Sequence, residues 1–220
     1  MEAAREQEGA VVQKYLSKPH LVDDLKYDLR IYVLLCGVNP LRIYIHRQSF
    51  ARFATEEYEE PCKDNMDNLF MHLTNYAINK NNDRFVQNED DEEDDVGHKR
   101  SLRAIFQIID EEGGDSEQLW AQIKDQIVKT LVIGQPYLSH LYRSCQPEDL
   151  DGSMCFQILG FDVFIDHKLR PWLIEVNQSP SFSTDSPLDY AVKKQVIGDA
   201  FHLLNISAER RNEMVALKRE

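Results

Sequence analysis

Apolar stretches along the chain predict a sheet of antiparallel strands with helices packed against it. Residues Asp28–Cys36 are apolar at nearly every position, which is typical of a strand buried on both faces. The dipeptide Asn39-Pro40 predicts a turn, and Leu41–His46 returns as a second strand, so the two form an antiparallel hairpin. A further short strand is predicted at Ala10–Leu16, whereas Ser49–Glu60 is interpreted as a loop or short helix.

A second hairpin is predicted later in the chain. Its strands are the apolar segments Phe156–Ile165 and Trp172–Val176, and the polar residues Asp166–Arg170 form the turn between them.

The helical spacing of apolar residues predicts a helix over Ser116–Leu131. The residues at this spacing are Leu119, Trp120, Ile123, Ile127, Val128 and Leu131. Gly134 and Pro136 interrupt the pattern, so its continuation through Tyr137–Tyr142 is either kinked or a second helix.

The last helix carries clear start signals. Ser186 is the expected N-cap, Pro187 suits the first helical position, and Asp189 lies at the spacing of a capping box. Its predicted apolar face consists of Leu188, Ala191, Val192, Val196, Ala200, Leu203 and Leu204.

These elements predict one α+β domain over residues 10–206, with a mainly antiparallel sheet flanked by helices. A polar segment (residues 1–9) precedes it and a charged tail (residues 207–220) follows. An acidic, solvated and disordered loop is expected at about residues 87–96, because Glu89–Asp95 are seven consecutive carboxylates.

The charge balance argues against some classes of binding protein. The net charge of −13 argues against a general nucleic-acid or membrane-surface binder, although much of it comes from the acidic run. The four cysteines show no CxxC spacing, which favours reduced thiols. No apolar run is long enough to span a membrane.

Three oxygen-bearing side chains belong to the second predicted hairpin. Asp162 lies on its first strand, and Glu175 and Asn177 lie at the end of its second strand. Mg²⁺ prefers oxygen ligands and usually takes one or two carboxylates, so the three side chains predict a magnesium site. The alternative is that they are ordinary polar residues at strand ends.

Other polar residues are candidates for binding an anion. Lys26, Asp28 and Arg30 alternate along one strand and therefore share a face, where they meet a ligand or else form an ion-paired strand end. Arg52, between aromatic residues, is suited to gripping a carboxylate or phosphate, or else it faces solvent over the rings.

The segment His72-Leu73-Thr74-Asn75, with Asn79, offers neutral hydrogen-bonding groups for phosphate oxygens. A turn capped by its own side chains is the alternative. The sequence contains neither the P-loop pattern nor GxGxxG, so bound phosphate must rely on Mg²⁺ and dispersed polar groups.

Taken together, these segments resemble the tubulin tyrosine ligase-like family of ATP-grasp amino-acid ligases. The resemblance extends from Val11 to Leu204, and the strings that carry it are VVQKYL (11–16), KYDLRIYVL (26–34), FARFAT (50–55), HLTNYAIN (72–79), GFDVFID (160–166) and LIEVNQSPSF (173–182). The PSF ending and VGHKR (96–100) are most similar to the polyglutamylase branch. The chain would be the later part of an ATP-grasp fold, because the lysines of the earlier lobe would precede Val11.

The resemblance implies roles at the matching positions. Asp162, Glu175 and Asn177 would hold Mg²⁺ against the phosphates of ATP, and Glu175, Arg30 and Arg52 would be catalytic residues. The residues that would bind the nucleotide are Gln13, Lys14, Tyr15, Leu16, Lys26, Asp28, His72, Thr74 and Asn75. Arg30 and Arg52 would meet phosphate, an acyl phosphate or the carboxylate of the amino acid.

The implied substrates are free glutamate and the acidic C-terminal tail of tubulin. Lys99 and Arg100 would touch the tail, and Gln178 would face the amino acid at a position where related sequences vary. The implied location is the cytoplasm, on microtubules, cilia or basal bodies. Alternatives are a ligase for glycine or tyrosine, a ligase for another acidic protein, and a catalytically incomplete module that only binds tubulin.

Overall fold

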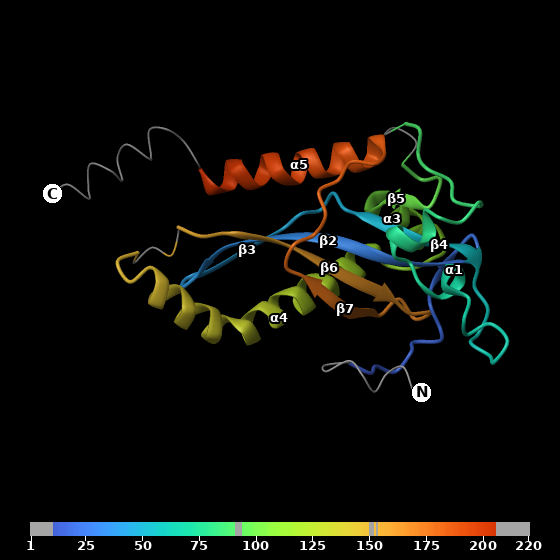
Figure 1. Cartoon of the computed structure of the whole chain (residues 1–220), viewed down its shortest axis with the longest axis horizontal. Coiled ribbons are helices and arrows are strands. Elements are labelled where there is room, and N and C mark those ends of the chain that lie inside the picture. Colours follow the sequence, from blue (N-terminus) through green and yellow to red (C-terminus); the bar gives the residue numbers. More distant parts are fainter. Residues whose placement is uncertain (1–10, 91–93, 150–151, 153, 206–220) are drawn as a thin grey trace.

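The computed structural model describes residues 11–90, 94–149, 152 and 154–205. A seven-stranded sheet forms the middle layer, in the order β5-β4-β2-β6-β7, and β1 and β3 also pair with β2 (Figure 1). The strands are β1 (Leu21–Val22), β2 (Leu25–Val38), β3 (Leu41–Ile45), β4 (Phe50–Glu57), β5 (Lys99–Ser101), β6 (Gln157–Ile165) and β7 (Pro171–Asn177). All the strand pairs are antiparallel, as predicted.

One face of the sheet, the apolar face, holds the main core. Alternate residues of β2, including Leu29, Ile31 and Val33, point to this face and are fully buried. Helices α3 (Leu102–Glu111) and α4 (Ser116–Cys145) pack against it.

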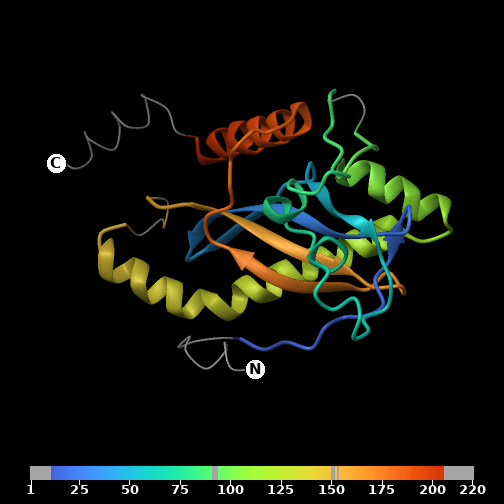
Figure 2. The same ribbon diagram turned by 45° about the vertical axis from the view of Figure 1, so that its right-hand side comes forward.

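The opposite face of the sheet, the polar face, is only partly covered. Helix α5 (Pro187–Leu204) lies over it, on the side of the sheet away from α4 (Figures 1 and 2). Leu188, Val192 and Val196 of this helix pack on Tyr32 and Phe50. The remaining part of the polar face carries charged side chains, so the sheet separates a structural core from the candidate site.

Both predicted hairpins are confirmed. β2 pairs with β3 across the Asn39-Pro40 turn, and β6 pairs with β7. In the second hairpin Asp162 lies directly opposite Glu175, and a register shift follows, from Asp162–Glu175 to Val163–Leu173. Between these two pairs β7 has one extra residue, Ile174, which forms a bulge. Bulges often re-aim side chains near functional sites.

The helix predictions are mostly right. α4 begins at Ser116 and buries Leu119, Trp120, Ile123, Ile127 and Leu131, but Val128 is exposed rather than part of the buried stripe. The helix continues through Pro136 to Cys145 as one element, so a separate second helix is not formed. Gln135 in this part donates to the Val38 carbonyl, and Leu138 and Tyr142 pack against the core.

α5 begins as predicted, with Ser186 as its N-cap and Pro187 at its start. Four residues of its expected apolar face are buried, namely Leu188, Val192, Val196 and Ala200, whereas Leu203 is 43% exposed. Asp189 does not complete a capping box, since its carboxylate is buried against two lysines described below.

Two predicted segments are wrong. The residues taken as a loop or short helix, Ser49–Glu60, contain β4, which is paired on both sides with β2 and β5. The segment taken as a strand, Ala10–Leu16, has no strand partner from Val11 onward, and Val11 and Val12 are exposed. A short apolar run does not make a strand unless a neighbouring strand pairs with it.

The remaining described segments include α1 (Leu69–His72) and α2 (Tyr76–Asn79), two single-turn helices beside β4. The middle of the acidic run and both chain ends lie outside the described residues. None of the described helices combines the length and apolar character needed to cross a bilayer.

Candidate functional site on the polar face

The polar face holds a network of buried charges. Arg30 of β2 donates from Nε and Nη2 to the two oxygens of Asp162 on β6, at 2.5 and 2.9 Å. Arg52 of β4 donates from Nε to Asp28 at 2.9 Å, and its Nη2 lies 2.8 Å from an oxygen of Asp162. Four charged side chains from three adjacent strands therefore pair with one another. The ion-paired alternative holds for Asp28 and Arg30, whose partners lie on the neighbouring strands, but not for Lys26.

The two arginines keep Asp162 ionised. Burial favours the neutral acid, but the hydrogen bonds and charges of Arg30 and Arg52 outweigh it and hold the pKa of Asp162 below its ordinary value. Burial likewise opposes the charge on Arg52, yet Asp28 and Asp162 raise its pKa. With its pKa lowered, Asp162 is a poor general base near neutral pH while these pairs persist.

Asp162, Glu175 and Asn177 converge at the end of β7. Asn177 donates from Nδ2 to Glu175 Oε1 at 3.0 Å and lies 3.3 Å from Asp162 Oδ2. Glu175 is exposed, Asn177 is half-buried and Asp162 is 2% exposed. An electropositive N–H group thus sits between two carboxylates, where negative potential is concentrated.

Two of these three residues, Glu175 and Asn177, can present an oxygen to a divalent cation without breaking an ion pair. Glu175 offers an exposed carboxylate, and a turn of the Asn177 amide would present its oxygen to the same point. Both oxygens of Asp162 are already held by arginines, so it can ligate only if Arg30 or Arg52 shifts. In the described segments no cluster of three or more His, Cys, Asp and Glu is suited to a metal, because the third donor here is an amide.

A second group joins three of the residues proposed for nucleotide binding. The hydroxyl of Tyr15 lies 3.0 Å from His72 Nδ1, and Lys26 Nζ donates to Tyr15 at 3.1 Å and to the His72 carbonyl at 2.6 Å. Burial lowers the pKa of Lys26 to about 8, despite the attraction of Asp28. Gln13 and Lys14 are exposed and Leu16 is half-buried in the preceding irregular segment.

In the polar segment at residues 72–79, the side chain of Asn79 has a structural role. Asn79 is fully buried, accepts from the backbone N–H and hydroxyl of Thr55, and donates to the carbonyls of Leu73 and Asn75. The side-chain-capped turn is therefore the correct interpretation for Asn79. Thr74 is buried, whereas Asn75 is exposed and borders the cavity described next.

A cavity of about 410 Å³, the basic cavity, adjoins the charge network. Five cationic side chains line it: Arg30, Arg52, Lys80, Lys99 and Lys193. Asn177 and the residues after β7, from Ser179 to Ser183, form another wall, and Asp185 is the acidic residue among its lining. A pocket with this charge is suited to a small anion, and the converging carboxylates lie at its edge.

Comparison with protein families matches residues 1–213 to the Tubulin-tyrosine ligase family. The chain belongs to this family. It is 50% identical over 210 residues to the "Probable beta-tubulin polyglutamylase" of Tetrahymena thermophila, covering 96% of this chain and 18% of that protein. It is 47% identical to "Tubulin polyglutamylase TTLL13" of Mus musculus (90% of this chain, 24% of that protein) and 43% identical to "Tubulin polyglutamylase TTLL6" of Homo sapiens (97% and 23%). The chain therefore spans about a fifth to a quarter of the length of these relatives.

Two residues of this tubulin-tyrosine ligase family domain that were expected to touch the tubulin tail are buried. Lys99 is 6% exposed and its Nζ lies 2.5 Å from Asp189, beneath the ring of Tyr76. Arg100 is 8% exposed and pairs with Asp23 at 2.7 Å. Lys99 borders the basic cavity rather than the outer surface, and tail contact by either residue stays a prediction. Gln178 is exposed, and its carbonyl accepts from Gln157 at 2.5 Å.

The sequence interpretation missed several residues that line the basic cavity. Tyr32 lies two residues beyond Arg30 on β2, and the same alternation that grouped Asp28 with Arg30 places it on the polar face. Lys193 lies four residues after Asp189 on α5, and its Nζ is 2.9 Å from that carboxylate. Tyr32 could have been found from the two-residue period of a strand, and Lys193 from the four-residue spacing of a helix.

Proposed function

We propose that the protein carrying this chain is a tubulin polyglutamylase, an ATP-dependent ligase that adds glutamate to glutamate side chains of tubulin tails. The observation that carries the proposal is the placement of a strongly basic cavity beside converging carboxylates in a member of the tubulin-tyrosine ligase family. The names of the relatives support the same activity. The protein would act in the cytoplasm on microtubules, including those of cilia or basal bodies.

The basic cavity would receive the free amino acid. Four of its five cations are paired with Asp28, Asp162 or Asp189, but they can share their hydrogen bonds with a substrate carboxylate. Such a lining favours a dicarboxylic substrate, which carries more negative charge than glycine or tyrosine. ATP would lie over the polar face between Tyr15–Lys26–His72 and the carboxylates, within the ATP-grasp arrangement that the family resemblance implies. Glu175 and Asn177, joined by Asp162 after a shift of an arginine, would hold Mg²⁺, which supplies charge neutralisation at the phosphates.

By binding these groups, the residues of this chain would bring the tail carboxylate, ATP and glutamate together. A γ-carboxylate of the tail attacks the γ-phosphorus of ATP, and ADP leaves with the electrons of the broken P–O bond. The amine of glutamate, having lost a proton, attacks the resulting acyl phosphate, and inorganic phosphate departs as the isopeptide bond forms. Arg30 and Arg52, held in place by Asp28 and Asp162, would stabilise the negative charge that develops on phosphate oxygens.

Replacing Glu175 tests this function. In the full-length protein with ATP, Mg²⁺ and tubulin, Glu175→Gln should lower incorporation of radiolabelled glutamate by roughly a hundredfold or more, because a preorganised charge next to the reacting phosphate is lost. Folding should be unchanged, since Glu175 is exposed.

The matched control is Glu111→Gln, which makes the same chemical change at an exposed position on α3, against the opposite face of the sheet. It should incorporate glutamate normally. Near-normal turnover by the Glu175 variant would refute the metal assignment, and a wild-type protein that never incorporates glutamate would refute the proposed function.

A further inference from the structure

The hydroxyl of Tyr32 is buried without a partner. Tyr32 is 1% exposed, and its oxygen has no hydrogen-bond partner in the described parts of the chain. Leaving a buried donor unsatisfied is costly for the free protein, and such groups in folded proteins call for an explanation. Phenylalanine would fill the same space without that cost, so the hydroxyl itself requires a reason.

The surroundings of Tyr32 place it in the wall of the basic cavity, beside Arg30 and Arg52. The Tyr32 ring is stacked on Phe182 at 5.8 Å between centroids and meets Phe50 edge-on at 6.1 Å. Burial raises the pKa of Tyr32 to about 12, so its hydroxyl is a protonated donor near neutral pH.

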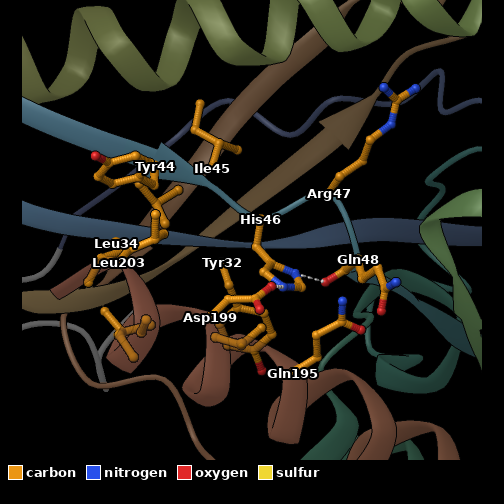
Figure 3. A pocket seen from close by; sticks show the side chains of 14 residues that line it. Tyr32, Leu34, Tyr44, Ile45, His46, Arg47, Gln48, Gln195, Asp199 and Leu203 are labelled. Carbon is orange, nitrogen blue, oxygen red and sulfur yellow. Dashed lines mark hydrogen bonds and ion pairs between the residues drawn. The ribbon is translucent and has the colours of Figure 1, made fainter. Parts of the chain in front are cut away.

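Tyr32 also lines a second pocket, of about 360 Å³, which lies between β2, β3 and α5 (Figure 3). Three of its polar residues are engaged with one another: His46 Nδ1 lies 2.6 Å from the Gln48 carbonyl, and its Nε2 lies 3.2 Å from Asp199. An anion held by the cationic lining of the basic cavity is a better acceptor for the hydroxyl.

We propose that Tyr32 is a substrate-binding residue that donates its hydroxyl hydrogen bond to an anionic oxygen in the basic cavity. This inference rests on the proposed function, in which the oxygen belongs either to a carboxylate of incoming glutamate or to the acyl phosphate. Both oxygens are negatively charged acceptors, and either would supply the partner that the Tyr32 hydroxyl lacks within the described chain.

Tyr32→Phe in the full-length protein tests the inference. The thermal midpoint should stay the same or rise, because no hydrogen bond of the free protein is lost. Steady-state glutamate incorporation should fall by roughly tenfold to a hundredfold in kcat/KM, the size expected for a hydrogen bond to a charged group. A rise in KM for glutamate assigns the bond to the carboxylate, whereas a fall in kcat with that KM unchanged assigns it to the acyl phosphate.

Tyr27→Phe is the matched control. Tyr27 lies on the same strand, is equally buried, faces the apolar side and bonds through its hydroxyl to His20 Nδ1 at 2.9 Å. Its variant should lose thermal stability and keep its kinetic constants, the reverse of the Tyr32 result. Wild-type kinetics in Tyr32→Phe, with an active wild-type enzyme, would overturn this inference alone, whereas an inactive wild-type enzyme would overturn the proposed function.

Discussion

The charged residues of the polar face differ in how they tolerate burial. Arg30, Arg52, Asp28 and Asp162 satisfy one another, which offsets the cost of removing them from water. Lys26 is different, because its ammonium group contacts a hydroxyl and a backbone carbonyl rather than a carboxylate. That difference is why its pKa moves down, to about 8, while the pKa of Arg52 moves up.

Lys26 should make stability depend on pH in the alkaline range. Its pKa is about 8 in the folded chain and about 10.4 when unfolded, so between these values the unfolded state binds more protons and stability rises with pH. Urea unfolding at pH 7.5, 8.5 and 9.5 should show the wild-type chain gaining free energy of unfolding relative to Lys26→Met. A constant difference between the two proteins across these pH values would contradict the assignment.

At the scale of elements, local signals predicted those elements whose starts or turns are marked in the sequence. The start of α5 was readable from Ser186 and Pro187, and the hairpins from their turns. β4 was missed because the local pattern of its residues does not distinguish a strand from a loop or short helix, and its pairing with the distant β2 and β5 makes it a strand. α3 was not predicted, although Leu102, Ile105 and Ile109 have helical spacing.

The N-cap of α5 gives a prediction about an element. Ser186 accepts a hydrogen bond from the backbone N–H of Asp189 at 3.1 Å, so Ser186→Ala should lower the free energy of unfolding by about 1 kcal/mol. Ser186→Thr should recover much of this loss, because threonine also caps helices. Ser144→Ala, on the exposed end of α4, should change stability by less than about 0.5 kcal/mol. Equal losses in the two alanine variants, measured by urea unfolding, would argue against the cap.

At the scale of the molecule, the charge is distributed unevenly. The chain carries a net charge of −13, yet the candidate site gathers five cations around one cavity. The sequence placed Arg30 and Arg52 in the site from their residue type and pattern, but Lys80, Lys99 and Lys193 meet there only through the packing of α2, β5 and α5 against the sheet. Such convergence depends on tertiary contacts and leaves no local pattern.

The acidic run Glu89–Asp95 follows a segment that contacts the lining of the basic cavity. Gln87, just before the run, donates to the carbonyl of Asp185, which lines the basic cavity, and Arg103 pairs with Asp94 within the run. Under the proposed function, the negative charge of this run should repel an acidic tubulin tail at distances within the Debye length, about 10 Å at 0.1 M salt. The run would therefore weaken tail binding in proportion to its charge.

Neutralising the run tests this electrostatic role. In the full-length protein, all seven acids are replaced by serine and asparagine. This variant should bind a fluorescent tail peptide roughly a few-fold more tightly than the wild type at about 0.05 M salt. The gain should shrink at about 0.5 M salt, because salt screens the charges. Neutralising Glu111 and Asp125, exposed on helices α3 and α4 against the opposite face, should have a smaller effect per charge removed. Weaker binding by the neutralised protein, or a gain that does not vary with salt, would mean that the run contributes a direct contact rather than repulsion.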